Sequence, residues 1–310
     1  MGLGTNHDTV TTAAVFIPEL WSDEVIGTYK SNLVVGNLVS KMNHVGKKGD
    51  TIHIPKPARN DASVKAASNQ VTLITDTATD LALSIDKHYE YSRLIEDIVD
   101  VQALESMRRF YTDDAGYALA KQVDTDLVNL WEAFQGGTAG AGWANAVIGG
   151  DGSTAYNDAT TGNGSALTDA GIRKMIQTLD DADVPLDQRV MVIPPVEKNV
   201  LLGLARFTEQ AFVGEVGAAN SIRSGLIGDI YGMPVYVSTN VPTETADDAS
   251  TTYRVGAIFH KSALVLIEQL MVRTQTQYKQ EYLGDLFTAD TIYGVGELRD
   301  DAGVAFVVPS

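Results

Sequence analysis

The sequence predicts an α+β fold built around one long helix. Three observations support this prediction. Residues 104–134 hold apolar residues at helical spacing, residues 46–91 hold two alternating stretches on either side of a polar loop, and residues 168–309 hold several short strands and helices. Together they predict a central helix, a projecting pair of strands and a mixed second half.

Composition limits the classes of function. The chain has 310 residues, 44% of them hydrophobic, which is enough for one large or two ordinary cores. It has no cysteine, which excludes disulfides, thiolate metal sites and a cysteine nucleophile. The formal charge is -17 and no basic cluster exceeds a pair, which argues against binding to nucleic-acid phosphates. Apolar runs of about 18 residues and a basic, apolar leader are absent, so we expect neither a membrane span nor a secretion signal.

The first 45 residues predict an extended arm followed by a helix. Residues 1–17 are small and polar and show no periodicity. From Pro18 onward apolar residues recur at helical spacing up to Val39, and Gly27 and Gly36 are positions where this helix can break. We therefore expect the helix to pack against an apolar surface.

Residues 46–91 predict a ribbon of two strands joined by a polar loop. A short strand over 51–55 leads into residues 55–69, which are polar, small and interrupted by two prolines, and the chain returns through 71–91. A lone ribbon is marginal in water, so we expect a second copy of the chain to cover its thin apolar face. The apolar residues along it are Ile52, Ile54, Val71, Leu73, Leu81, Leu83, Ile85, Tyr89 and Tyr91.

The central helix is predicted over residues 104–134, ending at Gly136 and Gly137. At about 1.5 Å per residue it would be roughly 45 to 50 Å long, enough to span most of a domain. Its polar side mixes both signs of charge, so one face should pack and the other should meet water or a partner. The apolar stripe comprises Leu104, Met107, Tyr111, Ala115, Leu119, Val123, Leu127, Leu130 and Phe134, and the polar side comprises Glu105, Arg108, Arg109, Asp113, Asp114, Lys121, Asp124, Asp126 and Glu132.

The second half predicts a surface loop followed by a compact unit of helices and strands. Residues 136–166 are rich in Gly, Ala and Thr but lack the Lys-Ser/Thr ending and the strand-to-helix setting of a phosphate loop. After this loop we expect three helices: one capped by Thr168, one from Pro195 and one at 260–268. We expect strands at 189–193, 226–231, 235–238, 254–259 and 270–278, of which the first is buried. Two C-terminal strands joined by a turn at 300–303 should end the chain.

This order of parts resembles the major capsid protein of tailed bacteriophages, which has the Hong Kong 97 fold. The similar segments are 85–101 (IDKHYEYSRLIEDIVDV), 109–126 (RFYTDDAGYALAKQVDTD), 225–241 (GLIGDIYGMPVYVSTNV) and the closing Val-Val-Pro. They are similar to coat proteins of short-tailed phages and their marine relatives. The resemblance covers nearly the whole chain.

The resemblance implies a division of the chain and a function. Residues 1–45 would be an N-terminal arm and helix, 46–91 an extended loop, 92–167 the spine helix and Gly-rich loop of a peripheral domain, 168–260 an axial domain, and 261–310 a return to the peripheral domain. The subunit would assemble in the host cytoplasm into hexamers and pentamers of an icosahedral shell around packaged double-stranded DNA. Predicted subunit-interface residues are Ile52, Ile54, Lys56, Arg59, Lys65, Val71, Leu73, Arg108 and Arg109.

The resemblance also implies partners. Relatives with an internal scaffold carry a long additional N-terminal segment that is absent from this sequence, which implies a separate scaffolding protein unless a longer precursor is processed. A portal protein and a decoration protein are further expected partners. Some relatives join subunits through Lys-Asn isopeptide bonds, but lysines such as Lys56 and Lys65 are common on solvated loops, so we expect no crosslink.

No catalytic, cofactor-binding or metal-binding residue is predicted. The five histidines form no metalloprotease motif, no Gly-x-Ser-x-Gly elbow occurs, and the aspartates near 180–187 lack the glycine and final glutamate of a calcium loop. His53 and His88 would form a metal pair only if they faced each other across the ribbon. Two alternatives to a virus shell remain open: the shell of an encapsulin-type cellular compartment, and a soluble α/β enzyme with residues 136–166 as a lid.

Overall fold

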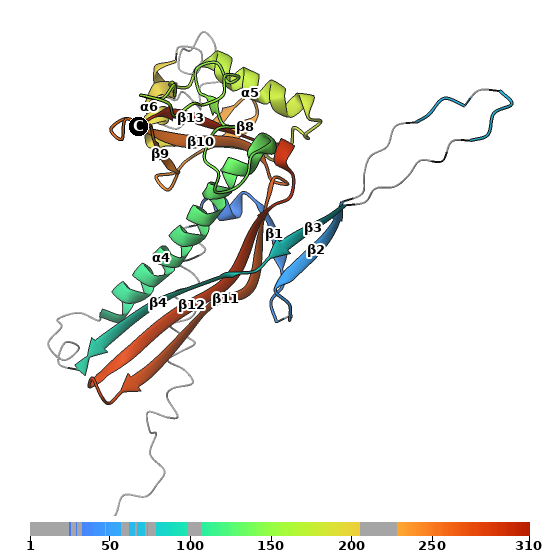
Figure 1. Cartoon of the computed structure of the whole chain (residues 1–310). Coiled ribbons are helices and arrows are strands. Elements are labelled where there is room, and N and C mark those ends of the chain that lie inside the picture. Colours follow the sequence, from blue (N-terminus) through green and yellow to red (C-terminus); the bar gives the residue numbers. More distant parts are fainter. Residues whose placement is uncertain are drawn as a thin grey trace, which may run out of the picture.

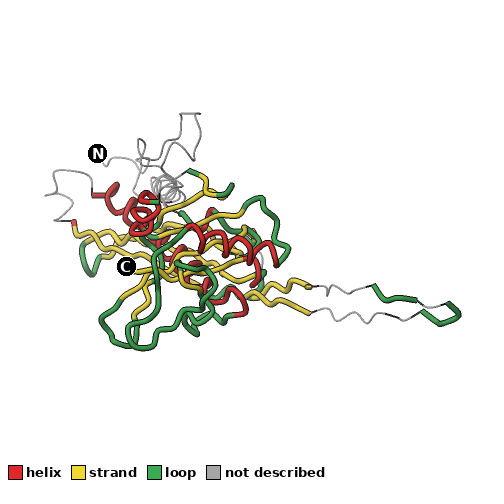
Figure 2. The backbone as a smooth tube through the Cα atoms, turned by 90° about the horizontal axis from the view of Figure 1, so that it is seen from above, coloured by secondary structure: helices red, strands yellow, loops and turns green. Residues whose placement is uncertain are grey.

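The computed structural model combines one long helix with three β-sheets (Figure 1). A four-stranded sheet runs beside the helix, a seven-stranded sheet forms the core at one end, and a two-stranded ribbon projects from the body. Seen from above, the ribbon again extends away from all other elements (Figure 2). The structure describes residues 25, 29, 33–46, 48–56, 62–65, 67–71, 73, 79–97, 107–204 and 228–310.

The central helix α4 (Met107–Asn129) continues as the 3-10 helix η2 (Leu130–Gly136). At about 1.5 Å per residue the 23 residues of α4 span roughly 35 Å, less than predicted because the last turns tighten into η2 and residues 101–106 lie outside the described chain. The predicted apolar stripe is confirmed by the burial of Ala115, Leu119, Val123 and Leu127. None of the described helices is both long enough and apolar enough to cross a membrane.

The aspartate at position 124 corrects the polar face predicted for this helix. Asp124 is 3% exposed, and its carboxylate accepts hydrogen bonds from the backbone N–H groups of Val34 and Gly36, both at 2.8 Å. Burial raises the pKa of Asp124, and the two hydrogen bonds partly oppose this effect. The side chain therefore fastens the segment before the first strand to the middle of α4.

The four-stranded sheet has the order β1-β11-β12-β4, in which β1 and β11 are parallel and the other neighbours antiparallel. Figure 1 shows α4 running along it. Two tyrosines tie the sheet to the helix, because Tyr91 donates to Asp114 at 2.6 Å and Tyr293 donates to Asp126 at 2.7 Å. The strands are β1 (Ser40–Asn43), β4 (Lys87–Glu96), β11 (Leu264–Lys279) and β12 (Gly284–Glu297).

Two helix predictions at this sheet are wrong. The helix expected at 260–268 is a turn followed by β11, whose first residues, Leu264–Ile267, are all fully buried. A strand covered on both faces is a continuous apolar run, which periodicity cannot distinguish from a buried helix. The helix expected to reach Val39 gives way to the 3-10 turn η1 (Val35–Asn37) and then to β1.

The seven-stranded sheet has the order β5-β13-β10-β6-β8-β7, with β9 also paired to β10. Its predicted helix α5 (Asp169–Asp181) is capped as expected, because Gly171 N–H donates to the Thr168 hydroxyl at 3.1 Å. The other elements are β5 (Val147–Ile148), β6 (Arg189–Ile193), α6 (Pro195–Gly203), β7 (Asp229–Ile230), β8 (Met233–Val237), β9 (Thr243–Thr245), β10 (Thr252–His260), the 3-10 turn η3 (Asp300–Ala302) and β13 (Gly303–Pro309).

The Gly-rich segment 136–166 was expected to be a surface loop, but parts of it belong to the core. Its strand β5 pairs in parallel with β13, and Trp143 and Tyr156 are buried. Tyr156 packs edge-on against Tyr253, with 5.6 Å between the ring centroids. A Cβ on Gly164 would lie 2.4 Å from that Tyr253 ring, so the glycine lets the loop backbone approach the aromatic core closely.

The two-stranded ribbon consists of β2 (Thr51–Lys56) and β3 (Thr79–Ser84). The predicted return strand is divided after β3, because β4 leaves the ribbon and pairs with β12 instead. The described stretches 62–65 and 67–71 lie at the far end of the ribbon, away from the body (Figure 1). The projection therefore has a base, formed by β2 and β3, and a far end, formed by the residues between these two strands.

Candidate subunit-assembly surface

The base of the ribbon is a regular antiparallel pair fixed to the body. Ile52 lies opposite Leu83 and Ile54 opposite Leu81, so the apolar side chains of both strands share one face. The backbone N–H of Ile85 donates to Asp50 O at 2.7 Å and closes the base of the ribbon. These contacts fix the register of the two strands.

This apolar face packs against the chain's own four-stranded sheet. Leu83 and Ile85 are buried together with Val265 of β11, and Ile52 and Ile54 pack against the same cluster as half-buried side chains. Close approach requires glycine in β12, because a Cβ at Gly294 would lie 2.5 Å from Ser84 O. The sequence led us to expect a second copy to cover this face, but at the base the subunit covers much of it itself.

The far end of the ribbon carries apolar side chains that no described residue covers. Val64, Val71 and Leu73 are 97%, 67% and 90% exposed. Large apolar side chains in such positions are commonly part of a binding surface when they occur together. Lys65 is exposed beside them, and Lys56 is exposed where β2 ends.

A groove of about 930 Å³ separates the ribbon base from the body. Ile54 and Leu81 line one side, and Leu298 and the aliphatic part of Arg299 lie on the other. Arg299 is held in place because it donates to Ala182 O and to the Asp301 carboxylate, both at 2.6 Å. The remaining acidic lining comprises Asp181, Asp183 and Asp300.

Glu297 lies at the end of β12, next to this groove, and faces Leu264 of β11 in the register. One of its carboxylate oxygens, Oε1, is buried without a hydrogen-bond partner among the described residues. Burial raises the pKa of Glu297 to about 7, with Asp300 adding to the effect and Lys56 opposing it. The carboxyl of Glu297 therefore ionises near neutral pH, and its ionisation is coupled to the charge of Lys56 on the ribbon.

Three of the predicted interface residues cannot be placed in this surface. Arg59 lies outside the described residues. Arg108 and Arg109 belong to the first turn of α4, for which only the backbone is described. Ile52 and Ile54 lie at the ribbon base, paired with β3. Lys65 and Val71 belong to the described stretches 62–65 and 67–71 at the far end of the projection, and Leu73 follows them in the sequence.

The histidines on the ribbon side of the molecule do not form a pair. His53 on β2 lies 2.5 Å from Asp80, and His88 on β4 lies 3.2 Å from Asp290, in a different sheet. Among the residues that the structure describes, no group of three or more His, Asp or Glu side chains is arranged to hold a metal ion.

Sequence reasoning missed the groove and Glu297 because their parts are far apart along the chain. Only the C-terminal turn carried a signal, the run Glu297–Asp301 with four charged residues. It also missed that Trp143 and Tyr156 are core residues, although two aromatic residues in an otherwise Gly- and Thr-rich segment could have indicated burial.

Comparison with protein families gives one result. The model of a family described as phage capsid protein matches residues 89–306, which is most of the chain. No curated protein matches the chain.

Solved structures agree with the family result. A structure titled Mycobacterium phage Che8 is 25% identical, with a TM-score of 0.67, and covers 88% of this chain and 90% of that chain. The capsid of cyanophage P-SCSP1u is 16% identical, with a TM-score of 0.68 and coverages of 90% and 88%. The acid-stable capsid of Helicobacter pylori bacteriophage KHP30 is 13% identical, with a TM-score of 0.66 and 91% coverage of both chains.

Proposed function

Since this chain belongs to the phage capsid protein family, it is a structural subunit of an icosahedral phage capsid rather than an enzyme, and we propose that the far end of its ribbon binds a neighbouring subunit. Capsid proteins of this kind build the shell from copies of themselves, as hexamers and pentamers, and have the Hong Kong 97-like fold. The observation that carries the proposal is the exposure of Val64, Val71 and Leu73 on a projection whose base is already packed.

Hydrophobic burial supplies part of the attraction between neighbours. Moving a Val or Leu side chain from full exposure to full burial contributes about 1.5 to 3 kcal/mol. Three such side chains per subunit would stabilise each ribbon contact by several kcal/mol before the cost of ordering the ribbon is subtracted. Because each subunit both gives and receives a ribbon, this contribution recurs at every contact of the shell.

Electrostatic attraction supplies a second part of the binding energy between neighbouring subunits. Residues 56–73 hold three cationic side chains and one acidic one, whereas the whole chain has a formal charge of -17. A positive ribbon above an acidic neighbour is attracted to it, and the same charges oppose contacts between two ribbons. Lys56, Arg59 and Lys65 therefore keep their predicted interface role, and Ile52 and Ile54 set the direction of the ribbon from below.

We further propose that the shell encloses double-stranded DNA and that its acidic composition limits adhesion to the packaged DNA. Assembly in the host cytoplasm, a separate scaffolding protein, a portal protein and a decoration protein belong to the same proposal. The division of the chain into the arm, extended loop, peripheral domain and axial domain given above is part of this proposal. A contact role for Arg108 and Arg109 is also part of it.

The two alternatives are less favoured. An encapsulin-type compartment shares the architecture, but the matching family and the similar structures reported above are those of phage capsids. An enzyme with residues 136–166 as its lid does not agree with that family, and these residues are partly built into the core through β5.

The proposal is tested by making the far end of the ribbon polar. We expect the triple variant V64S/V71S/L73S to fold, because these side chains are exposed, but to form few closed shells by electron microscopy and to sediment as subunits or small oligomers. The matched control is Leu186→Ser, which removes a side chain that is 72% exposed on the body. Normal shells from the triple variant would contradict the role given to the ribbon.

A further inference from the structure

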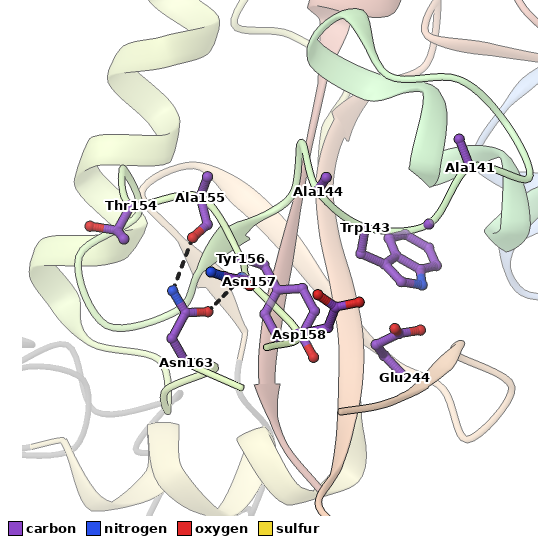
Figure 3. Close-up of a pocket in the computed structure, with 11 residues that line it drawn as sticks. Ala141, Trp143, Ala144, Thr154, Ala155, Tyr156, Asn157, Asp158, Asn163 and Glu244 are labelled. Atoms are coloured by element: carbon purple, nitrogen blue, oxygen red, sulfur yellow. Dashed lines mark hydrogen bonds between the residues drawn. The ribbon is translucent and has the colours of Figure 1, made fainter. Parts of the chain in front are cut away.

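A pocket of about 610 Å³ lies between the loop 141–158 and strand β9. Figure 3 shows the carboxylates of Asp158 and Glu244 near each other in this pocket, with the Tyr156 ring and the Trp143 indole beside them. No local sequence pattern indicates this site, because Glu244 is far from the loop along the chain.

No lysine or arginine is among the described residues that line the pocket with these two carboxylates. In the described part of the chain, neither Asp158 nor Glu244 has a side-chain hydrogen bond or an ion pair. Burial raises the pKa of Glu244, and the charges of Asp158 and Glu132 raise it further. Two neighbouring carboxylates without a basic side chain among the described lining residues form a site that a positive ligand would stabilise.

A third polar group in the pocket also lacks a partner. Tyr156 is 5% exposed, and its buried hydroxyl has no hydrogen-bond partner among the described residues. Burial raises the pKa of Tyr156 to about 12, with Glu244 and Asp158 among the groups that add to the effect. Buried hydroxyl groups are rarely left unsatisfied in native proteins, so this one indicates a ligand that forms a hydrogen bond with it.

The loop that carries these groups is held in shape by its own hydrogen bonds. Asn157 N–H donates to the Asn163 side-chain oxygen at 2.8 Å, and the Asn163 amide donates to Ala155 O at 3.0 Å. Both bonds are drawn in Figure 3. The position of Tyr156 is also fixed by its edge-on contact with Tyr253, so the pocket exists before any ligand enters.

We propose that this pocket binds an organic cation, a guanidinium or alkylammonium group, with Asp158 and Glu244 as counter-ions, Trp143 and Tyr156 as aromatic walls, and the Tyr156 hydroxyl as an acceptor. A bare divalent metal fits less well, because it would have only two carboxylates here and the walls are aromatic. Two sources supply the same chemistry: a free arginine-like molecule or polyamine, and a Lys or Arg side chain of a second copy of the chain.

The test is calorimetric titration of the unassembled full chain with L-argininamide, which carries a guanidinium and no carboxylate. We expect saturable binding of one molecule per subunit, weakened at least tenfold in the double variant D158N/E244Q. The matched control Glu281→Gln removes an equal kind of charge from an exposed turn elsewhere and should bind as the wild type does. Equal binding by the double variant, or tighter saturable binding of calcium chloride than of L-argininamide, would overturn the proposal.

A second variant separates binding from folding. Tyr156→Phe removes the buried hydroxyl and keeps the ring, so thermal unfolding of the free chain should occur at the same or a higher temperature. Binding of L-argininamide should nevertheless weaken several-fold, because the ligand loses an acceptor. A Tyr156→Phe variant that binds L-argininamide as tightly as the wild type would show that the hydroxyl does not face the ligand, and would overturn the geometry proposed here.

Binding of L-argininamide to assembled shells, compared with its binding to subunits, distinguishes the two sources of the cation. If a neighbouring copy supplies it, wild-type shells will not bind added L-argininamide although subunits do, and D158N/E244Q will weaken the shells. If the cation is free, shells and subunits will both bind it. Because the titration uses unassembled subunits with an intact ribbon, its failure is distinct from a failure of the ribbon variants to form shells.

Discussion

Replacement of Glu297 by glutamine should stabilise the subunit at neutral pH and above, and remove part of the pH dependence of its stability. In the folded chain, burial and Asp300 raise the pKa of Glu297 from its ordinary value of 4.5 to about 7, against the opposing charge of Lys56. The folded state therefore holds this proton more tightly than the unfolded state does. The stabilising contribution is fully present below about pH 4.5 and is lost as the pH rises through about 7.

The size of the effect follows from the same shift. Each unit of pKa corresponds to about 1.4 kcal/mol, so the full shift from 4.5 to about 7 would correspond to roughly 3 to 4 kcal/mol. Glu297 is only half-buried, and solvent screening reduces the contribution to about 1 to 2 kcal/mol. Glutamine cannot ionise, so its free energy of unfolding should lack this decline between about pH 4.5 and 7.

The measurement is urea unfolding of unassembled wild-type and Glu297→Gln subunits at closely spaced pH values from about 4 to 8. The difference between the two proteins should grow with pH in favour of the variant and level off above about pH 7. Glu281→Gln, on an exposed turn, is the control and should follow the wild type. A difference between wild type and Glu297→Gln that stays constant over this range would refute the assignment of the titration to Glu297.

Two further predictions concern the contacts that hold the spine and the ribbon. Asp124→Ala leaves the N–H groups of Val34 and Gly36 unsatisfied and should cost about 2 to 4 kcal/mol of unfolding free energy by urea unfolding, whereas the exposed control Lys121→Ala should cost under about 0.5. A loss below about 1 kcal/mol would contradict the anchoring role of Asp124. Gly294→Ala forces Ser84 O away from β12, so we expect a loss of about 1 to 3 kcal/mol and faster amide hydrogen exchange in β3, which exchange rates equal to those of the wild type would disprove.

The sequence predicted well those elements whose burial follows from one stretch of chain. The stripe of α4, the capped helix after Thr168 and the alternation of β2 each show a periodicity that only one kind of element can satisfy. The resemblance of the order of parts to tailed-phage capsid proteins then gave the family and the fold, which the comparisons confirm.

The failures share one physical cause, which is burial by residues distant in the sequence. The helical pattern places Asp124 on the polar face, but its hydrogen-bond donors are backbone groups nearly ninety positions away, which no local pattern can indicate. The apolar run Leu264–Ile267 fits a helix as well as a strand when read alone, because the layers that cover it come from other segments. The pocket at Asp158 and Glu244 likewise exists only because β9 returns beside the loop.

The ribbon shows why a shell subunit benefits from dividing one apolar surface into two parts. If the whole apolar face of the ribbon were buried only by a neighbouring subunit, the ribbon of the free subunit would have no preferred direction. Each contact between subunits would then carry the full entropic cost of ordering the ribbon. Packing Ile52 and Ile54 against the β11 side of the body fixes the direction of the ribbon beforehand, so that in the proposed contact the exposed Val64 and Leu73 would contribute mainly to adhesion. The same division places Lys56 and Glu297 where the fixed part ends, so a change in the charge of Glu297 near neutral pH acts at the point from which the ribbon projects. On this reasoning, Glu297→Gln should alter the pH dependence of shell assembly as well as that of subunit stability.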